Sequence, residues 1–202
     1  MSSWEGIHAR GNLEIEVFGL RLVVFRDTFN PDSKRTLTSQ AVIDVMPESF
    51  ASKTVLDIGS GSGVLGIKAA SLGAEHVVCT DIDDLVLKNI HLNFEINLIS
   101  SEKYTLVRSN LFSHVSGSFD YIFANLPILD DEWEGVDTAN LTENFLFEAK
   151  NFLSSDGVLL FSWASFGDVN HVESILERTS FTRKRHEFVR DKVTYFVYEL
   201  RL

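Results

Sequence analysis

A glycine-rich loop is the stretch of this sequence whose residue types and spacing point most directly to chemistry. Gly59, Gly61 and Gly63 follow a short apolar run at residues 54–58, and a helix-like pattern follows them. Glycines allow the chain to turn tightly and bring its backbone close to a ligand, and the first turn of a helix offers free N–H groups. The loop therefore predicts a nucleotide-binding site.

Two kinds of nucleotide fit this loop. Gly61, Gly63 and Gly66 match the dinucleotide fingerprint, although that match alone is weak. Asp57 favours the other kind, because it lies just before the first glycine, where its carboxylate would face the ligand and repel a pyrophosphate. A ligand with a positive amino or sulfonium group would be tolerated or favoured at this position.

A second carboxylate, Asp81, follows the next apolar run, HVVCT at residues 76–80. A carboxylate at this position can accept hydrogen bonds from both hydroxyls of a ribose. Both nucleotide classes use such a position, so Asp81 supports nucleotide binding without choosing between them. The alternative is that Asp81 caps the following helix, a role that Asp83 and Asp84 can already fill.

An asparagine closes a later apolar run and raises the question of chemistry at its side chain. FDYIFA, at residues 119–124, is followed by Asn125, Leu126 and Pro127. The asparagine could take part in catalysis, or it could only end a strand before a turn. The answer depends on whether the fold brings it close to the glycine loop.

Apolar runs alternate with helical patterns along most of the chain. We predict strands at residues 54–58, 76–80, 104–108, 119–124 and 157–164, helices at residues 63–72, 83–97, 140–152 and 168–178, and a closing antiparallel pair at residues 181–189 and 192–200. The third helix is expected to begin at Asn140, because Asn140 and Glu143 have capping-box spacing. This order predicts a parallel sheet with helices on both faces, which binds ligands at the carboxyl ends of its strands.

A hairpin and a helix precede this repeating unit. Residues 12–25 contain two alternating runs around Gly19, and residues 37–46 have the pattern of a leading helix. We therefore expect two parts, an N-terminal hairpin extension at residues 1–35 and a main domain at residues 36–202.

Composition narrows the classes of function. The chain has 202 residues and a net charge of −11, and its acidic excess lies in residues 54–137, which disfavours a polyanionic partner. A single cysteine, Cys79, and the lack of a signal peptide lead us to expect a cytoplasmic protein. No apolar run approaches the roughly 18 residues that a membrane helix needs.

The sequence also gives no sign of a metal site. Histidines, carboxylates and cysteines do not have metal-binding spacing, so no metal is expected.

Three motifs resemble those of class I S-adenosylmethionine-dependent methyltransferases. They are VLDIGSGSGVLGI, the TDID after the second predicted strand and the SNLF after the third. The chain is similar to the small-domain N-methyltransferase branch, which includes release-factor glutamine and ribosomal RNA guanine N-methyltransferases. The resemblance covers roughly residues 36–164. It implies a Rossmann-like, seven-stranded, mostly parallel sheet in the order 3-2-1-4-5-7-6, with the last strand antiparallel.

The resemblance also implies which residues bind S-adenosylmethionine. Asp57 and the glycine loop would hold the methionine part, Asp81 the ribose, and Asn110 with Leu111 the adenine. The implied cofactor-binding residues are Asp57, Gly59, Ser60, Gly61, Gly63, Asp81, Ile82, Asn110, Leu111 and Asn125. Residues 29–31, Phe-Asn-Pro, resemble a segment that lines the donor pocket in this branch, or they form a turn.

In this branch the fourth strand ends in Asn-Pro-Pro-aromatic, and this chain has Asn125-Leu126-Pro127-Ile128. The asparagine oxygen and the next backbone carbonyl accept the N–H groups of an acceptor nitrogen, which directs its lone pair toward the methyl group. The resemblance thus implies Asn125, Leu126 and Pro127 as catalytic residues. Ile128 replaces the ring that stacks on a planar substrate, and Trp133 either supplies a ring instead or serves as an anchor.

The acceptor is open between several classes. The loop at residues 130–137 is rich in carboxylates and has no basic residue, so it is either a solvated loop or one that attracts a cationic substrate. We expect a nitrogen on a protein side chain or on another amine or amide. One alternative is an RNA or DNA base, in which case RKRH at residues 183–186 would bind the nucleic acid. Another is that the chain is a catalytically inactive cofactor-binding domain. A dehydrogenase is a more distant alternative.

Overall fold

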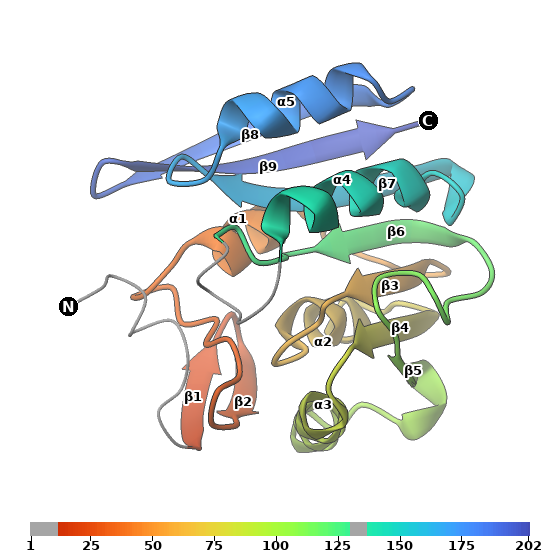
Figure 1. The fold of residues 1–202 in the computed structure, drawn as a ribbon. Coiled ribbons are helices and arrows are strands. Elements are labelled where there is room, and N and C mark those ends of the chain that lie inside the picture. The colour runs from red at the N-terminus through yellow and green to blue at the C-terminus, as the bar shows by residue number, and fades with distance from the viewer. Residues whose placement is uncertain (1–11, 130–136) are drawn as a thin grey trace.

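A seven-stranded sheet forms the centre of the protein (Figure 1). The structure is a computed structural model that describes residues 12–129 and 137–202. The strands of the sheet are β3 (Thr54–Ile58), β4 (His76–Asp81), β5 (Tyr104–Arg108), β6 (Phe119–Ala124), β7 (Leu153–Ala164), β8 (Thr182–Arg190) and β9 (Val193–Arg201). The helices are α1 (Thr38–Val45), α2 (Val64–Ser71), α3 (Asp84–Ile96), α4 (Thr138–Ala149) and α5 (Val169–Glu177), with a short 3-10 helix, η1 (Ser101–Lys103), before β5.

The strand order is β5-β4-β3-β6-β7-β9-β8. The strands from β3 to β7 pair in parallel, whereas β9 is antiparallel to both of its neighbours, β7 and β8. Numbered from β3, this is the order 3-2-1-4-5-7-6, so the predicted α/β fold and its topology are confirmed. The order reverses between β3 and β6, which is where sheets of this kind bind ligands.

Helices cover both faces of the sheet. One core contains buried residues of α1, α2 and α3, such as Val42, Ile67 and Ile90. The other core contains buried residues of α4 and α5, such as Phe145 and Ile175. Successive residues of the central strands alternate between these two cores, as expected for strands that are buried on both faces.

The starts of α4 and β7 differ from the predicted starts by two and four residues, and most other bounds differ by one residue. Helix α4 begins at Thr138, because the side chain of Asp137 accepts a hydrogen bond from the N–H of Asn140 and caps the helix. Asn140 therefore lies in the first turn, and the prediction that it opens the helix was wrong. Strand β7 begins at Leu153 instead of Gly157, with a register shift against β6 near Phe119.

The N-terminal hairpin forms a separate two-stranded sheet of β1 (Leu13–Val17) and β2 (Leu20–Val24). Its turn places Phe18 and Gly19 at φ values of 56° and 75°, as in the two-residue turns whose twist matches that of the strands. The predicted hairpin around Gly19 is thus confirmed.

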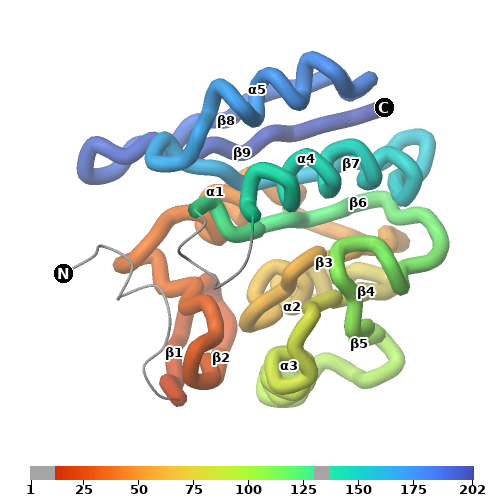
Figure 2. The backbone as a smooth tube through the Cα atoms, viewed as in Figure 1, coloured from red at the N-terminus to blue at the C-terminus, as the bar shows by residue number. Residues whose placement is uncertain are grey.

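A row of asparagines along α3 and at its C-cap attaches this hairpin to the helix. Asn89, Asn93 and Asn97 follow one another at single helical turns. Their side-chain oxygens accept the backbone N–H groups of Phe25, Val23 and Arg21, at 3.0, 2.8 and 3.1 Å respectively. Their amide groups donate in return to the carbonyl oxygens of Val23 and Arg21. Figure 2 shows how the chain leaves the hairpin and runs past the carboxyl ends of the parallel strands to α1.

Candidate active site

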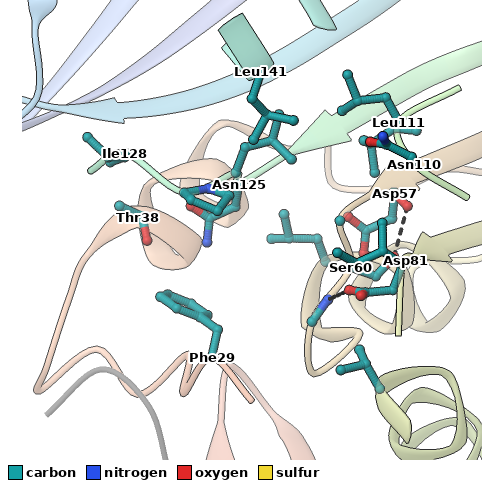
Figure 3. Close-up of a pocket in the computed structure, with 18 of the residues that line it drawn as sticks. Phe29, Thr38, Asp57, Ser60, Asp81, Asn110, Leu111, Asn125, Ile128 and Leu141 are labelled. Atoms are coloured by element: carbon teal, nitrogen blue, oxygen red, sulfur yellow. Dashed lines mark hydrogen bonds between the residues drawn. The ribbon is translucent and has the colours of Figure 1, made fainter. Parts of the chain in front are cut away.

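A cavity of about 650 Å³ opens at the carboxyl ends of the parallel strands (Figure 3). The loops after β3, β4, β5 and β6 line it, together with the segment before α1 and one face of α4. The predicted site residues in its lining are Asp57, Gly59, Ser60, Gly61, Asp81, Ile82, Asn110, Leu111, Asn125, Leu126 and Pro127. Gly63 precedes α2 with a φ of 80° and is not part of the lining. One cavity thus gathers the residues predicted for donor and acceptor.

Ser60 fixes the glycine loop against β4. Its hydroxyl oxygen lies 2.8 Å from the carbonyl oxygen of Asp57 and 3.2 Å from that of Thr80, and it accepts the N–H of Thr80 at 3.1 Å. Gly59 has a φ of 63°, a conformation that glycine adopts without strain. A Cβ at this position would lie 2.9 Å from Cδ2 of Leu126, so this loop approaches the loop after β6 closely at Gly59.

The Asp57 carboxylate is buried, with 1% of the residue exposed. Its Oδ2 accepts the N–H of Gly66, in the first turn of α2, at 3.0 Å. Burial raises the pKa of Asp57 from 3.8 to about 7, against the opposing effect of the Gly66 hydrogen bond. A cationic group bound in the cavity would favour the ionised form of this carboxyl.

Asp81 is partly buried at the end of β4. Its Oδ2 accepts the N–H of Gly61 and its Oδ1 accepts the N–H of Asp83, both at 3.2 Å, and burial raises its pKa. Asp83 is the residue that caps α3, because its Oδ1 accepts the N–H of Leu85 at 2.7 Å. Ile82 lies beside Asp81 with 57% of its surface exposed and gives the cavity an apolar wall.

Ser109 shapes the loop after β5. Its hydroxyl donates to the carbonyl oxygen of Leu111 at 2.8 Å and accepts the N–H of His114 at 3.1 Å. Leu111 has a φ of 46°, and it lies beside Asn110 at one end of the cavity (Figure 3). Ser109 was not among the residues predicted from the sequence, although a hydroxyl residue directly after a strand is a signal for such a loop.

Asn125 follows β6, and its side chain points into the cavity opposite Phe29 (Figure 3). Its Nδ2 donates to the hydroxyl of Ser39 on α1 at 3.1 Å, and its Oδ1 accepts from the hydroxyl of Ser162 on β7 at 2.7 Å. Neither serine was predicted from the sequence. They lie 86 and 37 positions away from Asn125, so only the fold brings the three residues together.

Ile128 belongs to the core, with 5% of its surface exposed, and it packs beside Gly167. Two rings line the cavity from other segments, Phe29 before α1 and Phe166 after β7. Ile128 also lines the cavity (Figure 3), so the position that is aromatic in the resembling branch gives it an aliphatic side chain, and the two rings come from other segments.

The described lining of the cavity is acidic. It includes the carboxylates of Asp57, Asp81, Asp137 and Glu148, and none of the described lining residues is Lys, Arg or His. Trp133 and residues 130–136 of the predicted acidic loop lie outside the described residues. A cavity with this charge disfavours a phosphate and favours a neutral or cationic ligand.

The basic run at residues 183–186 lies on the edge strand β8 and faces carboxylates. Arg183 and Arg185 each form an ion pair with Glu173 of α5, at 3.3 and 2.8 Å. His186 lies 3.0 Å from Glu199 of β9. A nucleic-acid phosphate would have to compete with these carboxylates for the same cations.

Residues 12–129 and 137–202 contain neither a metal-binding cluster nor a membrane-spanning helix. No three His, Cys, Asp or Glu side chains there come together in a way that could hold a metal ion. None of the helices there is long and apolar enough to cross a membrane.

Comparisons with known proteins show the family of the chain. The model of the methyltransferase small domain matches residues 33–199. The "Putative protein N5-glutamine methyltransferase" of Methanocaldococcus jannaschii is 29% identical over 158 residues, which cover 72% of this chain and 76% of that protein. The ribosomal protein L11 methyltransferase of Lactobacillus gasseri is 31% identical over 73% of this chain and 43% of that protein. A crystal structure described as a putative methyltransferase complexed with SAH has a TM-score of 0.71 at 18% identity, covering 95% of this chain and 56% of that one.

The chain belongs to the methyltransferase small domain family. It is an S-adenosylmethionine-dependent methyltransferase, and S-adenosylmethionine is its methyl donor. The residues of the cavity fit that donor, because a glycine loop, two carboxylates and the apolar side chains of Ile82 and Leu111 lie around one space. The chain spans less than half the length of the L11 methyltransferase that it matches.

Proposed function

We propose that this protein transfers a methyl group to an amide or amine nitrogen of a protein, and that Asn125 orients the acceptor. The observation that carries the proposal is the position of Asn125, whose side chain points into the same cavity that the glycine loop lines. Two relatives named for protein substrates, a glutamine and ribosomal protein L11, support a protein acceptor.

The donor half of the cavity consists of the loops after β3, β4 and β5. S-adenosylmethionine, when bound, supplies an electrophilic methyl group on a sulfonium. Asp57 and the glycine loop would hold its methionine end, because a buried carboxylate and close backbone N–H groups suit an amino acid. Asp81 would accept the ribose hydroxyls, and Ile82, Asn110 and Leu111 would enclose the adenine.

The acceptor half is built around the loop after β6. The Asn125 oxygen and the Leu126 carbonyl would accept the N–H groups of the acceptor nitrogen and direct its lone pair toward the methyl group. Pro127 stiffens the loop, so these oxygens need little reorganisation before reaction. The acceptor nitrogen would form a bond to the methyl carbon as the bond from that carbon to the sulfonium sulfur breaks. The sulfur would keep the electron pair and leave as a neutral thioether, and the methylated nitrogen would release a proton to water. The contribution of the protein to this step is alignment.

The negative charge of the cavity favours a protein or another amine or amide as the acceptor. Its described carboxylates, which include Asp137 and Glu148, would attract a basic segment of a protein, and they would repel the phosphates of a nucleic acid. The basic run on β8 supports the same choice, because its arginines already face Glu173. A protein or another amine or amide is therefore favoured over an RNA or DNA base.

Two further expectations belong to this proposal. We propose that residues 1–35 form an extension of a methyltransferase domain at residues 36–202, and the family match over residues 33–199 supports a boundary near this point. We also propose the cytoplasm as the compartment, a choice supported by the relatives named for a ribosomal protein.

Labelled methyl transfer into cell extract tests the acceptor class. The purified protein is incubated with tritiated S-adenosylmethionine and an extract of source cells that lack it, and the product is then treated with protease or with nuclease. The proposal predicts that the label stays in macromolecules after nuclease and becomes soluble after protease. Release by nuclease alone would assign a nucleic-acid acceptor, and no incorporation at all would contradict a macromolecular acceptor.

A further inference from the structure

Ser162 is a polar residue in an otherwise apolar strand. It lies in the run VLLFSWA of β7, and none of its surface is exposed. A buried hydroxyl costs free energy unless it is hydrogen-bonded. Here its oxygen lies 2.7 Å from Oδ1 of Asn125 and 3.4 Å from the carbonyl oxygen of Ala124, so the shorter bond goes to Asn125.

The sheet itself brings Ser162 and Asn125 together. β6 and β7 are parallel, and Ala124 pairs with Phe161. The next residue on each strand is therefore Asn125 and Ser162. Phe161 points into the core under α4 and α5, so Ser162 points to the opposite face, the one that α1 covers.

Ser39 approaches Asn125 from that helix. It lies in the first turn of α1, with 1% of its surface exposed, and its hydroxyl accepts a hydrogen bond from Nδ2 of Asn125 at 3.1 Å. The asparagine amide is thus held at both ends by serines on two elements, α1 and β7, that pack on one another.

We propose that Ser39 and Ser162 are positioning residues that fix the Asn125 amide with one oxygen lone pair directed at the acceptor. An amide oxygen has two lone pairs and an amide nitrogen has two hydrogens. Each serine takes one of them, which leaves one acceptor site and one donor site for ligands. Without the serine bonds the amide could rotate about its last side-chain bond and present its nitrogen where the oxygen is needed.

The inference rests on the proposed function, because the serines act through Asn125 and not on the substrate. A misplaced acceptor group loses alignment of the reacting atoms, which costs about tenfold to a hundredfold in rate. Removal of either serine hydroxyl should therefore lower kcat while donor binding changes little. The loss should disappear when Asn125 is absent.

A double-mutant cycle tests this role. Ser162→Ala, Asn125→Ala and the double variant are compared for tritium incorporation from S-adenosylmethionine into the extract described above, and Ser39→Ala is measured alongside. Ser162→Ala should lower the rate about tenfold. The double variant should be no slower than Asn125→Ala alone.

Thr142→Val is the matched control, since the Thr142 hydroxyl is buried on α4 and has no hydrogen-bond partner in the described part of the chain. It should leave the rate unchanged. A second readout needs no acceptor: the side-chain amide resonances of Asn125 in proton–nitrogen correlation spectra should shift or broaden in Ser162→Ala and stay in place in Thr142→Val.

The possible outcomes separate the two proposals. If Asn125→Ala keeps the full rate, the proposed function of Asn125 fails. If Asn125→Ala is slow but Ser162→Ala and Ser39→Ala both keep the full rate and an unchanged Asn125 resonance, only the positioning role fails. Additive losses in the double variant would also overturn it, because they would show that Ser162 acts independently of Asn125.

Discussion

At the scale of single residues, Asp57 is a buried carboxyl group that accepts one hydrogen bond and has a raised pKa. Burial raises its pKa to about 7, so the carboxyl of the free protein titrates near neutral pH. A donor with a positive amino group and a sulfonium would favour the ionised form and thereby release a proton on binding.

The affinity for S-adenosylmethionine should therefore rise with pH through about 7. If the bound state keeps Asp57 ionised, affinity falls by about tenfold from pH 8 to pH 6. Calorimetric titration with S-adenosylmethionine across this range checks the prediction. Asp57→Asn keeps an oxygen for the Gly66 N–H and should bind more weakly at pH 8 with a flatter pH dependence. A dependence as steep as that of wild type would contradict the assignment.

The same variant has an opposite effect on the stability of the free protein. The folded pKa of Asp57 lies above its ordinary value of 3.8, so the folded state binds the proton more tightly than the unfolded state does. This contribution to stability is complete below about pH 4 and is lost as the pH rises through about 7. Asp57→Asn should therefore be more stable than wild type at pH 8, whereas Asp156→Asn, at an exposed carboxylate, should not.

At the scale of elements, the row of asparagines on α3 connects the hairpin to the donor site. Asn93 is fully buried, and it bonds both backbone groups of Val23 and the carbonyl oxygen of Ser62 in the glycine loop. One side chain thus holds the edge of β2 and the loop that approaches the donor.

Asn93→Ala should lower the free energy of unfolding by about 2 kcal/mol, because it leaves buried backbone groups without partners. The substitution should also weaken S-adenosylmethionine binding, because the Ser62 carbonyl loses its hydrogen bond from the Asn93 side chain. Urea unfolding and calorimetry measure the two effects. Asn97→Ala is the control at the exposed end of the row. It should lower the free energy of unfolding by about 1 kcal/mol without changing donor binding. Equal donor affinity in all three proteins would rule out the connection.

The elements themselves were largely predictable from sequence. Short apolar runs such as HVVCT and FDYIFA alternate with helical patterns, and this alternation is sufficient for a parallel sheet. The start of α4 was not predicted, because Asn140 with Glu143 offered a convincing capping box only one turn after the actual cap, Asp137. Local signals of equal quality cannot be ranked without the tertiary structure.

The site was predictable only where its residues follow strands directly. Asp57, Asp81 and Asn125 lie at strand ends, so the topology alone places them at one edge. Ser39 and Ser162 could not be found in this way, because their role depends on the register of β6 with β7 and on the packing of α1.

At the scale of the whole molecule, an acidic chain presents an acidic cavity. The net charge is −11, and the described cavity lining has carboxylates without a balancing cation. Asp137 is a useful probe of this charge, since it both lines the cavity and caps α4.

Asp137→Asn should raise KM for a basic protein acceptor several-fold and weaken its salt dependence, with little change in kcat or in thermal stability. The asparagine keeps the oxygen that caps the helix and removes only the charge. Asp168→Asn is the matched control, because Asp168 caps α5 and does not line the cavity. If the two variants behave alike toward the acceptor, the charge of Asp137 has no part in acceptor binding.

The central claim is that Asn125 orients a nitrogen acceptor beside bound S-adenosylmethionine. The most direct test is the rate of methyl transfer by Asn125→Ala relative to wild type, measured with protein that binds the donor equally well by calorimetry. The account predicts that donor affinity changes by less than about threefold while the transfer rate falls by a hundredfold or more, to about the level expected when an oriented polar group is removed. A variant that binds the donor and transfers methyl groups at the wild-type rate would contradict the claim.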